Sequence, residues 1–375
     1  MNRSLISVSL ALLLLAGLLL AACGGTPAPL APDGSPPPPA GTETATTVVD
    51  ALDRTVEFPA PPQRIVVAGK STLNIVEALY LFPEAAGRLV GLVVGQQKPG
   101  AFLSLVDPAF DQKAVLPVEA GPEQIAPLHP DVVVARSFMA ETLGKSLEQV
   151  GIPVVYVDLE TPDQYHRDVT TLGQLLGNST RAGEIRAFYQ TRQDRVDVAL
   201  QGLSDGEKPR VLVVQYSDQG GAAALNVPSA AWLQTTEVEL AGGLPVWKEA
   251  AQGGGWTVVN LEQIAAWDPD QIFVVSYKAD PSQVVEKLKA DPQWQALKAV
   301  KAGQIYGFPS DVFSWDQPDP RWILGLTWLA GKMHPDRFAG LDMKDEASQF
   351  FEQMYGLDPS TVEEEILPVL KGDVE

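Results

Sequence analysis

The sequence has few of the residues on which disulfide and metal chemistry depend. Its 375 residues include one cysteine and three histidines. A single cysteine leaves the chain without an internal disulfide, so the stability of the fold must come from its core. A site for a bare zinc ion draws on several histidines and carboxylates. We expect His129 in a turn and His166 and His334 at helix ends, so we predict no site for a free metal ion.

Basic residues and catalytic motifs are scarce as well. The 27 lysines and arginines are outnumbered by 47 aspartates and glutamates, which gives a formal net charge of −20. So acidic a surface argues against binding to nucleic acid and against electrostatic adhesion to anionic lipid. The sequence also lacks G-x-S-x-G, H-E-x-x-H and paired Cys/His spacings. We therefore predict no catalytic residues, no cofactor and no enzymatic activity.

An ATP site is not supported by the one tetrapeptide that suggests it. Residues 69–72 are GKST, the end of a P-loop, but the full motif needs a glycine five residues earlier, where the chain has Arg64. The apolar run after this arginine belongs to a strand, which leaves too short a turn to wrap a triphosphate. Lys70, Ser71 and Thr72 instead open a helix, where free N–H groups favour an anionic or oxygen-rich ligand.

The N-terminus indicates export. Residues 1–22 combine one arginine, a long apolar run and small residues, which is typical of a secretory signal peptide. The sequence LAAC that ends at Cys23 is similar to the lipobox of bacterial lipoproteins. This resemblance implies that Cys23 is diacylated and becomes the new N-terminus. A plain transmembrane anchor that carries a cysteine is the alternative.

The segment after the signal has the composition of a tether. Residues 23–46 are rich in proline and glycine and poor in large apolar residues, so they cannot build a core. Two or more acyl chains on one residue give lasting attachment to a membrane. We therefore expect an extracytoplasmic protein that is lipid-anchored to the bacterial cell membrane.

An internal repeat organises the rest of the chain. The sequences EQIAPLHPD and EQIAAWDPD begin at Glu123 and Glu262, and each is followed by an apolar strand. Each copy lies in a half that begins with another apolar strand, RIVVA from Arg64 and RVLVV from Arg210. The repeat predicts two similar lobes.

The two lobes alternate short apolar strands with helices. We place them at 47–178 and 204–375, with one long interdomain helix at 179–203 that Ser179 or Thr180 can cap. Strands separated by helices predict parallel sheets with helices on both faces. The predicted fold class is α/β, with two Rossmann-like lobes, one long joining α-helix and a ligand cleft between the lobes. Strands of the first lobe are expected near 64–68, 89–94, 132–135 and 153–157, and those of the second in RVLVVQ, QIFVVS and QIYGF.

The sequence resembles the substrate-binding lipoproteins of ABC importers, in the class III periplasmic binding proteins that capture iron–siderophore, haem and cobalamin complexes. The likeness rests on the lipobox, the bridged lobes, the E-Q-I-A…P-D repeat and three longer phrases, and it covers nearly all of 47–360. The phrases are DALDRTVEFPAPPQRIVV, DPQWQALKAVKAGQIYGFP and WDQPDPRWILGLTWLAGKMHPDRF. The resemblance implies permease subunits of an ABC importer as partners. In the family, the positions of Glu123 and Glu262 pair with permease arginines; stabilisation of a helix N-terminus is the structural alternative.

The ligand is expected between the lobes, beyond the carboxyl ends of the strands. The candidates are Lys70, Ser71, Gln97, Lys98, Arg136 and Ser137 in the first lobe, and Tyr216, Trp256, Tyr277, Lys278 and Trp315 in the second. Together they predict a pocket of basic and aromatic groups. Trp322 and Trp328 lie six residues apart on an apolar helix and are expected in the core.

These residue types rank the possible cargoes. Basic groups suit an anion and aromatic groups suit an apolar or π-bearing surface, so a ferric siderophore comes first, then molybdate or tungstate, then cobalamin. Haem-binding relatives use a tyrosine just before the first-lobe glutamate, and the corresponding VLPVEAGPE has none. A sensor lipoprotein that binds ligand without an importer is a further alternative. Glu123 and Glu262 distinguish the two, because only an importer receptor needs them for docking.

Overall fold

Buried runs of β-branched residues form a five-stranded parallel sheet in the first half of the chain. The computed structural model describes residues 45–94, 102–219 and 222–375. The sheet has the order β5-β4-β3-β6-β7, and neighbouring strands all run parallel. Its strands are β3 (Ile65–Val67), β4 (Leu89–Val93), β5 (Ala114–Leu116), β6 (Val132–Arg136) and β7 (Val154–Val157). We call this part of the chain the first lobe; its four expected strands are confirmed, and β5 is additional.

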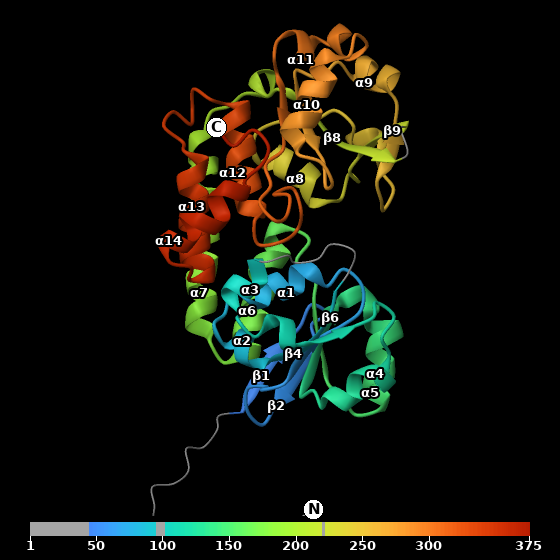
Figure 1. The fold of residues 1–375 in the computed structure, drawn as a ribbon, viewed down its shortest axis with the longest axis vertical. Helices are drawn as coiled ribbons and strands as arrows, with labels where there is room; N and C mark the ends of the chain where they lie inside the picture. The colour runs from blue at the N-terminus through green and yellow to red at the C-terminus, as the bar shows by residue number, and fades with distance from the viewer. Residues whose placement is uncertain (1–44, 95–101, 220–221) are drawn as a thin grey trace, which may run out of the picture. The chain divides into compact units, whose positions relative to one another are not determined.

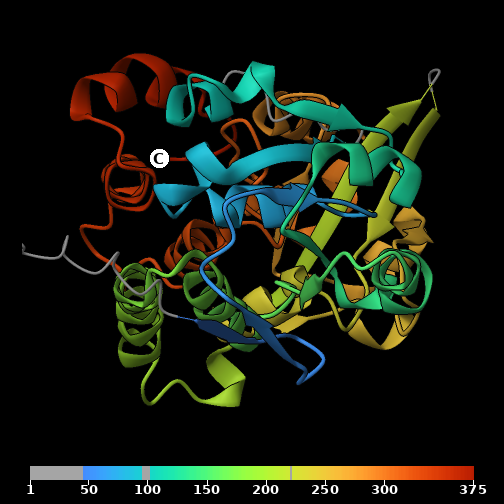
Figure 2. The same ribbon diagram turned by 90° about the horizontal axis from the view of Figure 1, so that it is seen from below.

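Helices connect the strands of the first lobe, and a hairpin precedes them. The helices are α1 (Leu73–Leu79), α2 (Glu84–Arg88), α3 (Phe102–Val106), α4 (Pro122–Ile125), α5 (Lys145–Gln149) and α6 (Pro162–Leu176). The antiparallel hairpin of β1 (Thr46–Val49) and β2 (Thr55–Phe58) packs against α6 (Figure 2). Asp50 forms its turn by accepting hydrogen bonds from the N–H groups of Leu52 and Arg54. The strand pattern in the sequence did not predict this hairpin.

The second lobe contains a mixed sheet. Its order is β11-β9-β8-β12-β13, with β10 also paired to β8. The three strands expected from the sequence, β8, β12 and β13, run parallel as predicted. The strand β9 pairs antiparallel with β8 and with β11. The bounds are β8 (Arg210–Gln219), β9 (Ala222–Val227), β10 (Leu244–Pro245), β11 (Thr257–Val259), β12 (Gln271–Val275) and β13 (Ile305–Gly307).

One long helix joins the lobes, as expected. It is α7 (Ser179–Ala199), which contains no proline. The N-cap is Asn178, whose side chain accepts a hydrogen bond from the backbone N–H of Arg181, so the cap lies one residue before the predicted Ser179. Figure 1 shows α7 beside α12 (Trp322–Met333) and α13 (Met343–Tyr355). The other helices of the second lobe are α8 (Leu233–Leu240), α9 (Leu261–Trp267), α10 (Pro281–Ala290), α11 (Lys298–Lys301) and α14 (Pro359–Thr361).

The two copies of the sequence repeat form the same local structure. In the first copy, the backbone N–H of Arg64 donates to a carboxylate oxygen of Asp131 at 2.9 Å. In the second, the backbone N–H of Arg210 donates to Asp270 at 2.8 Å. Each of these aspartates is the P-D aspartate directly before a strand, β6 or β12; Arg64 directly precedes the neighbouring strand β3, and Arg210 begins the neighbouring strand β8. The sequence repeat is therefore also a structural repeat, because the same aspartate–backbone hydrogen bond joins the starts of two neighbouring strands in each lobe.

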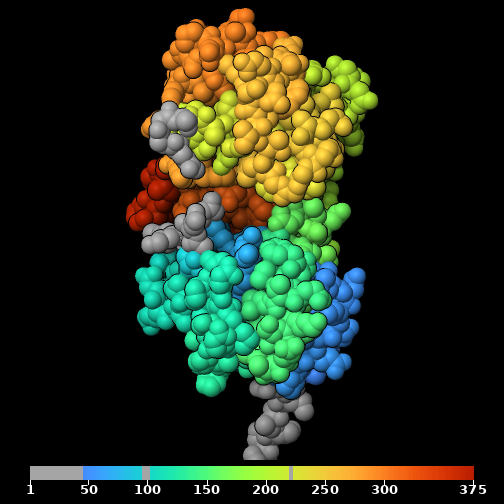
Figure 3. Space-filling view, turned by 90° about the vertical axis from the view of Figure 1, so that its right-hand side faces the viewer, coloured from blue at the N-terminus to red at the C-terminus, as the bar shows by residue number. Residues whose placement is uncertain are grey.

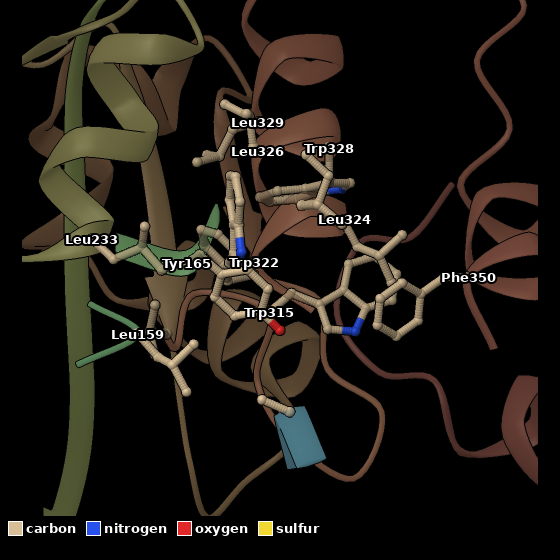
Figure 4. Packing of buried hydrophobic residues seen from close by; sticks show 14 of the residues in the cluster. Leu159, Tyr165, Leu233, Trp315, Trp322, Leu324, Leu326, Trp328, Leu329 and Phe350 are labelled. Carbon is tan, nitrogen blue, oxygen red and sulfur yellow. The ribbon is translucent and has the colours of Figure 1, made fainter. Parts of the chain in front are cut away.

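Large apolar side chains from both halves of the chain form one continuous core. Trp322 and Trp328 of α12 are buried in it, as predicted. Trp322 stacks on Tyr189 of α7 with ring centroids 5.4 Å apart, and Figure 4 shows it beside Tyr165. Residues 43–375 form a single compact unit around this core. Within the described ranges, no helix is long and apolar enough to cross a membrane.

Candidate ligand-binding site

A pocket of about 220 Å³ lies where the carboxyl ends of first-lobe strands meet a segment that follows β13. Its polar lining groups are Ser71, Asn74, Arg136 and Glu160 of the first lobe, and Gln317 and Asp319. In Figure 3 the dark orange segment near residue 315 lies between the blue-to-green first lobe and the yellow part of the second. We call this space the arginine pocket. Of the sequence candidates, it brings Ser71 and Arg136 together.

Ser71 enters the arginine pocket from a turn of unusual backbone geometry. The φ angles of Gly69 and Ser71 are 99° and 55°, both positive. Residues other than glycine rarely adopt a positive φ. Thr72 follows and donates a hydrogen bond from its hydroxyl to the carbonyl of Val93 at 2.9 Å. A strained residue at a pocket wall is typical of functional sites. Of the GKST sequence, Ser71 thus lines the arginine pocket just before the short helix α1.

Arg136 is the main cation of the arginine pocket. It is the last residue of β6 and only 3% exposed, because the strand delivers it to the edge of a fully buried sheet. Its guanidinium forms an ion pair with Glu160, which is partly exposed. The Nε atom is buried and has no hydrogen-bond partner among the described residues. A buried donor without a partner costs about 1–3 kcal/mol, so the site favours an oxygen atom supplied from outside the protein.

A second pocket, of about 250 Å³, lies beyond the carboxyl end of β12. We call it the lysine pocket; Gln317 lines both pockets and so connects them. Its charged lining residues are Lys278, Lys371 and Asp311, and its other polar lining residues include Ser276, Tyr277, Ser310 and Ser314. Both lysines are exposed, and neither has an ion-pair partner in the described part of the chain. The lysine pocket therefore adds positive charge beside Gln317.

Tyr277 anchors a row of three aromatic rings at the lysine pocket. The ring of Trp256 lies 6.3 Å from that of Tyr277 and 5.5 Å from that of Trp232, and all three are half-buried. The Tyr277 hydroxyl donates to Asp316 at 2.8 Å, and Gln234 donates to the same oxygen at 3.1 Å. Burial, followed by the nearby Asp316, raises the pKa of Tyr277 well above its ordinary value, so the phenol stays protonated. Tyr277 thus lines the lysine pocket, and Trp256 packs against its ring.

Lys70 lies outside both pockets. It is exposed, and its ammonium lies 3.8 Å from the carboxylate of Glu119. Together with Phe138, which is 57% exposed, it lines a separate groove of about 560 Å³ on the first lobe. The hydroxyl of Ser137 donates to Asp158 and is not part of either pocket lining. Lys70 and Ser137 are therefore next to the proposed cargo site rather than in it.

Two aromatic candidates are corrected by the structure. Trp315 is fully buried and donates from its indole N–H to Asp311 at 2.8 Å, and Figure 4 shows it packed among Leu324 and other core side chains. Tyr216 is only 6% exposed, because β8 continues past it into the hairpin with β9. Its hydroxyl contacts the Lys287 ammonium at 2.6 Å. Neither side chain lines the arginine pocket or the lysine pocket, so we leave both out of the site.

Two predicted residues lie outside the described structure, and Glu160, Gln317 and Asp319, which line the arginine pocket, were not predicted. Gln97 and Lys98 lie outside the described residues. The rule that ligands bind beyond strand ends would have found Glu160 after β7. No such rule points to Gln317 and Asp319, because they belong to the segment SWDQPDPRW, which follows no strand directly.

The two repeat glutamates are exposed at equivalent positions of the two lobes. Glu123 is in the first turn of α4 and Glu262 in the first turn of α9. Neither carboxylate has an ion-pair partner in the ranges that the structure describes. Both surfaces are open to a partner, and both positions also suit stabilisation of a helix N-terminus.

The histidines contribute to neither pocket. His129 ends the helical segment after α4 with a left-handed φ of 48°. A ring nitrogen of His166 lies 2.8 Å from the side-chain oxygen of Gln193. His334 is buried at the end of α12. Across the described residues there is no group of three histidine, cysteine, aspartate or glutamate side chains that could hold a metal ion.

Comparison with known proteins now decides the family. The periplasmic binding protein family matches residues 106–312, which is more than half of the chain. The chain belongs to the periplasmic binding protein family. Its fold is similar to that of a solved TroA-like periplasmic binding protein of Veillonella parvula, with a TM-score of 0.68 at 19% identity over 82% of this chain and 95% of that one. Members of this family bind solutes outside the cytoplasm and are not enzymes, as the sequence predicted.

Relatives in this family bind different cargoes. The molybdate-binding protein MolA of Haemophilus influenzae is 25% identical over 333 residues, 82% of this chain and 90% of that protein. Its structure with molybdate bound has a TM-score of 0.67 at 22% identity and covers 83% of this chain and 98% of that one. An Fe(3+)-citrate-binding protein of Bacillus subtilis is 25% identical over 68% of this chain and 75% of its own length. A cobalamin-binding protein of Halobacterium salinarum is 25% identical over 77% and 74%.

Proposed function

We propose that this protein is the lipid-anchored receptor of an ABC importer and that its cargo is an oxygen-rich anion bound between Arg136 and the lysine pocket. The observation that carries the proposal is the unpartnered Nε of Arg136 in a pocket walled by both lobes. Around Gln317, three cations line the two pockets of a strongly negative protein, together with the carboxyl groups of Glu160, Asp311 and Asp319. An anion is the ligand that such a site recognises.

The size of the pockets favours a metal oxyanion such as molybdate over a ferric siderophore. Each pocket is below about 300 Å³, the lower end of the range for drug-sized ligands. A tetrahedral oxyanion fits inside either pocket, and the likeness to a molybdate-binding protein over 90% of its length agrees with this. The geometry thus reverses the first two places of the ranking drawn from the sequence.

A ferric siderophore is the second candidate, and the aromatic row is the observation that favours it. Trp232, Trp256 and Tyr277 offer ring faces and edges that a small oxyanion does not need. A chelate would have to extend across both pockets and over the aromatic row. Cobalamin is larger still and has no need of the cations, so it comes third.

Native mass spectrometry of the full mature chain in detergent distinguishes these cargoes. The protein is offered molybdate, a ferric trihydroxamate and cobalamin together, each at micromolar concentration. We expect retention of one molybdate per chain and its loss in Arg136→Met. Retention of the ferric complex instead would restore the order drawn from the sequence. Retention of none of the three would contradict the proposed cargo class.

Delivery to a permease and attachment to the membrane complete the proposal. The exposed Glu123 and Glu262 suit arginines on the two halves of an importer, and their occurrence once per lobe suits a two-fold partner. Cys23 and the tether at 23–46 would hold the binding unit near that partner. A sensor lipoprotein without an importer has the same cleft but no need of the two glutamates.

A further inference from the structure

Two residues that line the arginine pocket each carry a buried polar atom with no hydrogen-bond partner among the described residues. One is Nε of Arg136, on the first lobe, and the other is Oδ2 of Asp319, which comes from the second half of the chain. Both side chains are only 3% exposed. Oδ1 of Asp319 is occupied, because it accepts a hydrogen bond from the backbone N–H of Arg321 at 2.8 Å. Oδ2 is therefore the unpartnered oxygen of a residue that lines the pocket.

The charges around Asp319 determine its protonation. Arg321 is fully buried and is the one cation among three carboxyl groups, those of Glu77, Asp311 and Asp319. Asp311 accepts hydrogen bonds from Arg321 Nε, from the Trp315 indole and from two backbone N–H groups. Glu77 forms an ion pair with Arg321 Nη1. Asp319 has only the backbone N–H and a guanidinium nitrogen at 3.9 Å.

One buried cation does not balance three buried carboxylates, so the most weakly held of them keeps its proton. By the contacts above, this is Asp319. Burial raises the pKa of Asp319 well above its ordinary value, and the carboxylates of Glu77 and Asp311 raise it further against the opposing effect of Arg321. Because Oδ1 is occupied as an acceptor, the proton resides on Oδ2, so this residue of the pocket lining carries a donor.

We propose that Arg136 and Asp319 form a paired donor site for the oxygen atoms of the cargo, with Asp319 bound as the neutral acid. This inference rests on the proposed function, since it assumes that cargo occupies the arginine pocket. The guanidinium supplies one N–H and the acid supplies one O–H to two oxygens of the same oxyanion or chelate. Asp319 thereby adds a hydrogen bond for an anion without adding a negative charge to its site.

Other ionisable groups that face Asp319 do not provide this donor. Glu237 is fully buried beside it, and burial raises its pKa well above the ordinary value. The phenols of Tyr165, Tyr189 and Tyr355 also face it, and burial raises the pKa of each, so they stay uncharged. On the pocket wall, Arg136 and Glu160 form an ion pair with each other. As pH rises, ionisation of Asp319 would remove a donor and add a charge that repels the anion.

Three variants and calorimetry with molybdate test the inference. In Asp319→Asn, the amide oxygen can accept from Arg321 while the amide N–H faces the pocket, so affinity at pH 6 should stay within about threefold of the wild type. In Asp319→Leu the donor is lost, and affinity should fall by about tenfold or more. Glu237→Gln is the matched control, because it replaces a buried acid that lines neither pocket; it should bind as the wild type does. Toward pH 10 the wild type should weaken relative to Asp319→Asn.

Two results of the calorimetry would overturn the inference. A tenfold gain in affinity for Asp319→Asn at pH 7 would show that Asp319 is ionised and would overturn the inference. Wild-type affinity in Asp319→Leu would overturn it as well, because Asp319 would then make no contact with the cargo. If molybdate does not bind, a ferric trihydroxamate is the second probe for the same variants.

A measurement without cargo separates this inference from the proposed function. The infrared difference spectrum of wild type minus Asp319→Asn at neutral pH should show the C=O stretch of a protonated carboxyl. Its absence would contradict the neutral acid even if cargo binds normally. Failure of the wild type to bind either probe, with that band present, would contradict the proposed cargo and leave the protonation of Asp319 established.

Discussion

Arg321 and Glu77 form an ion pair in which both side chains are fully buried. Glu77 is on α1, one turn after Asn74, and Arg321 follows Asp319 by two residues. Asn74 and Asp319 both line the arginine pocket. The ion pair therefore fastens together the two walls of the proposed cargo site, which come from opposite halves of the chain.

Breaking this ion pair should destabilise the whole fold. Arg321→Met leaves the carboxylates of Glu77 and Asp311 buried without their cation, and we expect a loss of about 3–5 kcal/mol in the free energy of unfolding. Urea denaturation measures it. Arg186→Met, at an exposed position of α7, is the control and should change the free energy by less than about 0.5 kcal/mol. A loss below about 1 kcal/mol in Arg321→Met would show that the pair is not structural.

The buried Glu237 should make stability depend on pH. Burial, followed by the nearby Asp316, raises its pKa well above the ordinary 4.5, and neither of its carboxylate oxygens has a partner in the described structure. The folded state then holds a proton that the unfolded state releases above that ordinary pKa. Stability therefore falls as pH rises from about 4.5 to the folded pKa, by up to about 1.4 kcal/mol per pH unit.

Glu237→Gln removes this proton and tests the prediction. The difference in unfolding free energy between variant and wild type should grow in favour of the variant from pH 5 to pH 8, measured by urea denaturation. Glu364→Gln, at an exposed site, should show no such trend. A difference for Glu237→Gln that is the same at every pH would mean that Glu237 is ionised in the folded protein.

Sequence patterns predicted the fold better than the site. Runs such as RIVVA and QIFVV are strands because fully buried parallel strands need continuous apolar sequence, and the repeat predicted two lobes because Asp131 and Asp270 close equivalent corners. Arg136 was found because parallel strands direct their following residues to one edge. Trp315 was misplaced because a tryptophan in a loop sequence gives no sign of whether it faces solvent or core. Asp319 was not predicted because its role depends on its contacts with Arg321 and on the nearby Glu77. Glu77 is far from Asp319 in the sequence.

Docking to a permease should depend on both repeat glutamates. Glu123→Arg combined with Glu262→Arg puts positive charge where the partner is expected to be basic, so uptake should fall by at least about tenfold. Ligand affinity should stay near that of the wild type, since neither position lines a pocket. Glu57→Arg with Glu364→Arg, two exposed sites elsewhere, has the same change in net charge and should leave uptake intact. Normal uptake by the first pair would favour a role at the helix N-termini and the sensor alternative.

The lipid anchor has its own test at Cys23. Cys23→Ala should give an unprocessed or soluble protein in place of a lipoprotein, because no other cysteine is present in the sequence to accept the lipid. Metabolic labelling with a palmitate analogue measures the modification. Labelling that persists in the variant would contradict the lipobox interpretation and favour a plain transmembrane anchor.

Calorimetric titration of molybdate into the wild type and Arg136→Met tests the central claim most directly, that an oxyanion binds the buried guanidinium between the lobes. Lys145→Met removes an exposed cation of the first lobe outside both pockets and is the control for net charge. We predict binding of one molybdate per wild-type chain, a loss of affinity of at least about tenfold in Arg136→Met, and little change in Lys145→Met. Equal affinity in the wild type and Arg136→Met, or no binding to the wild type at all, would contradict the account.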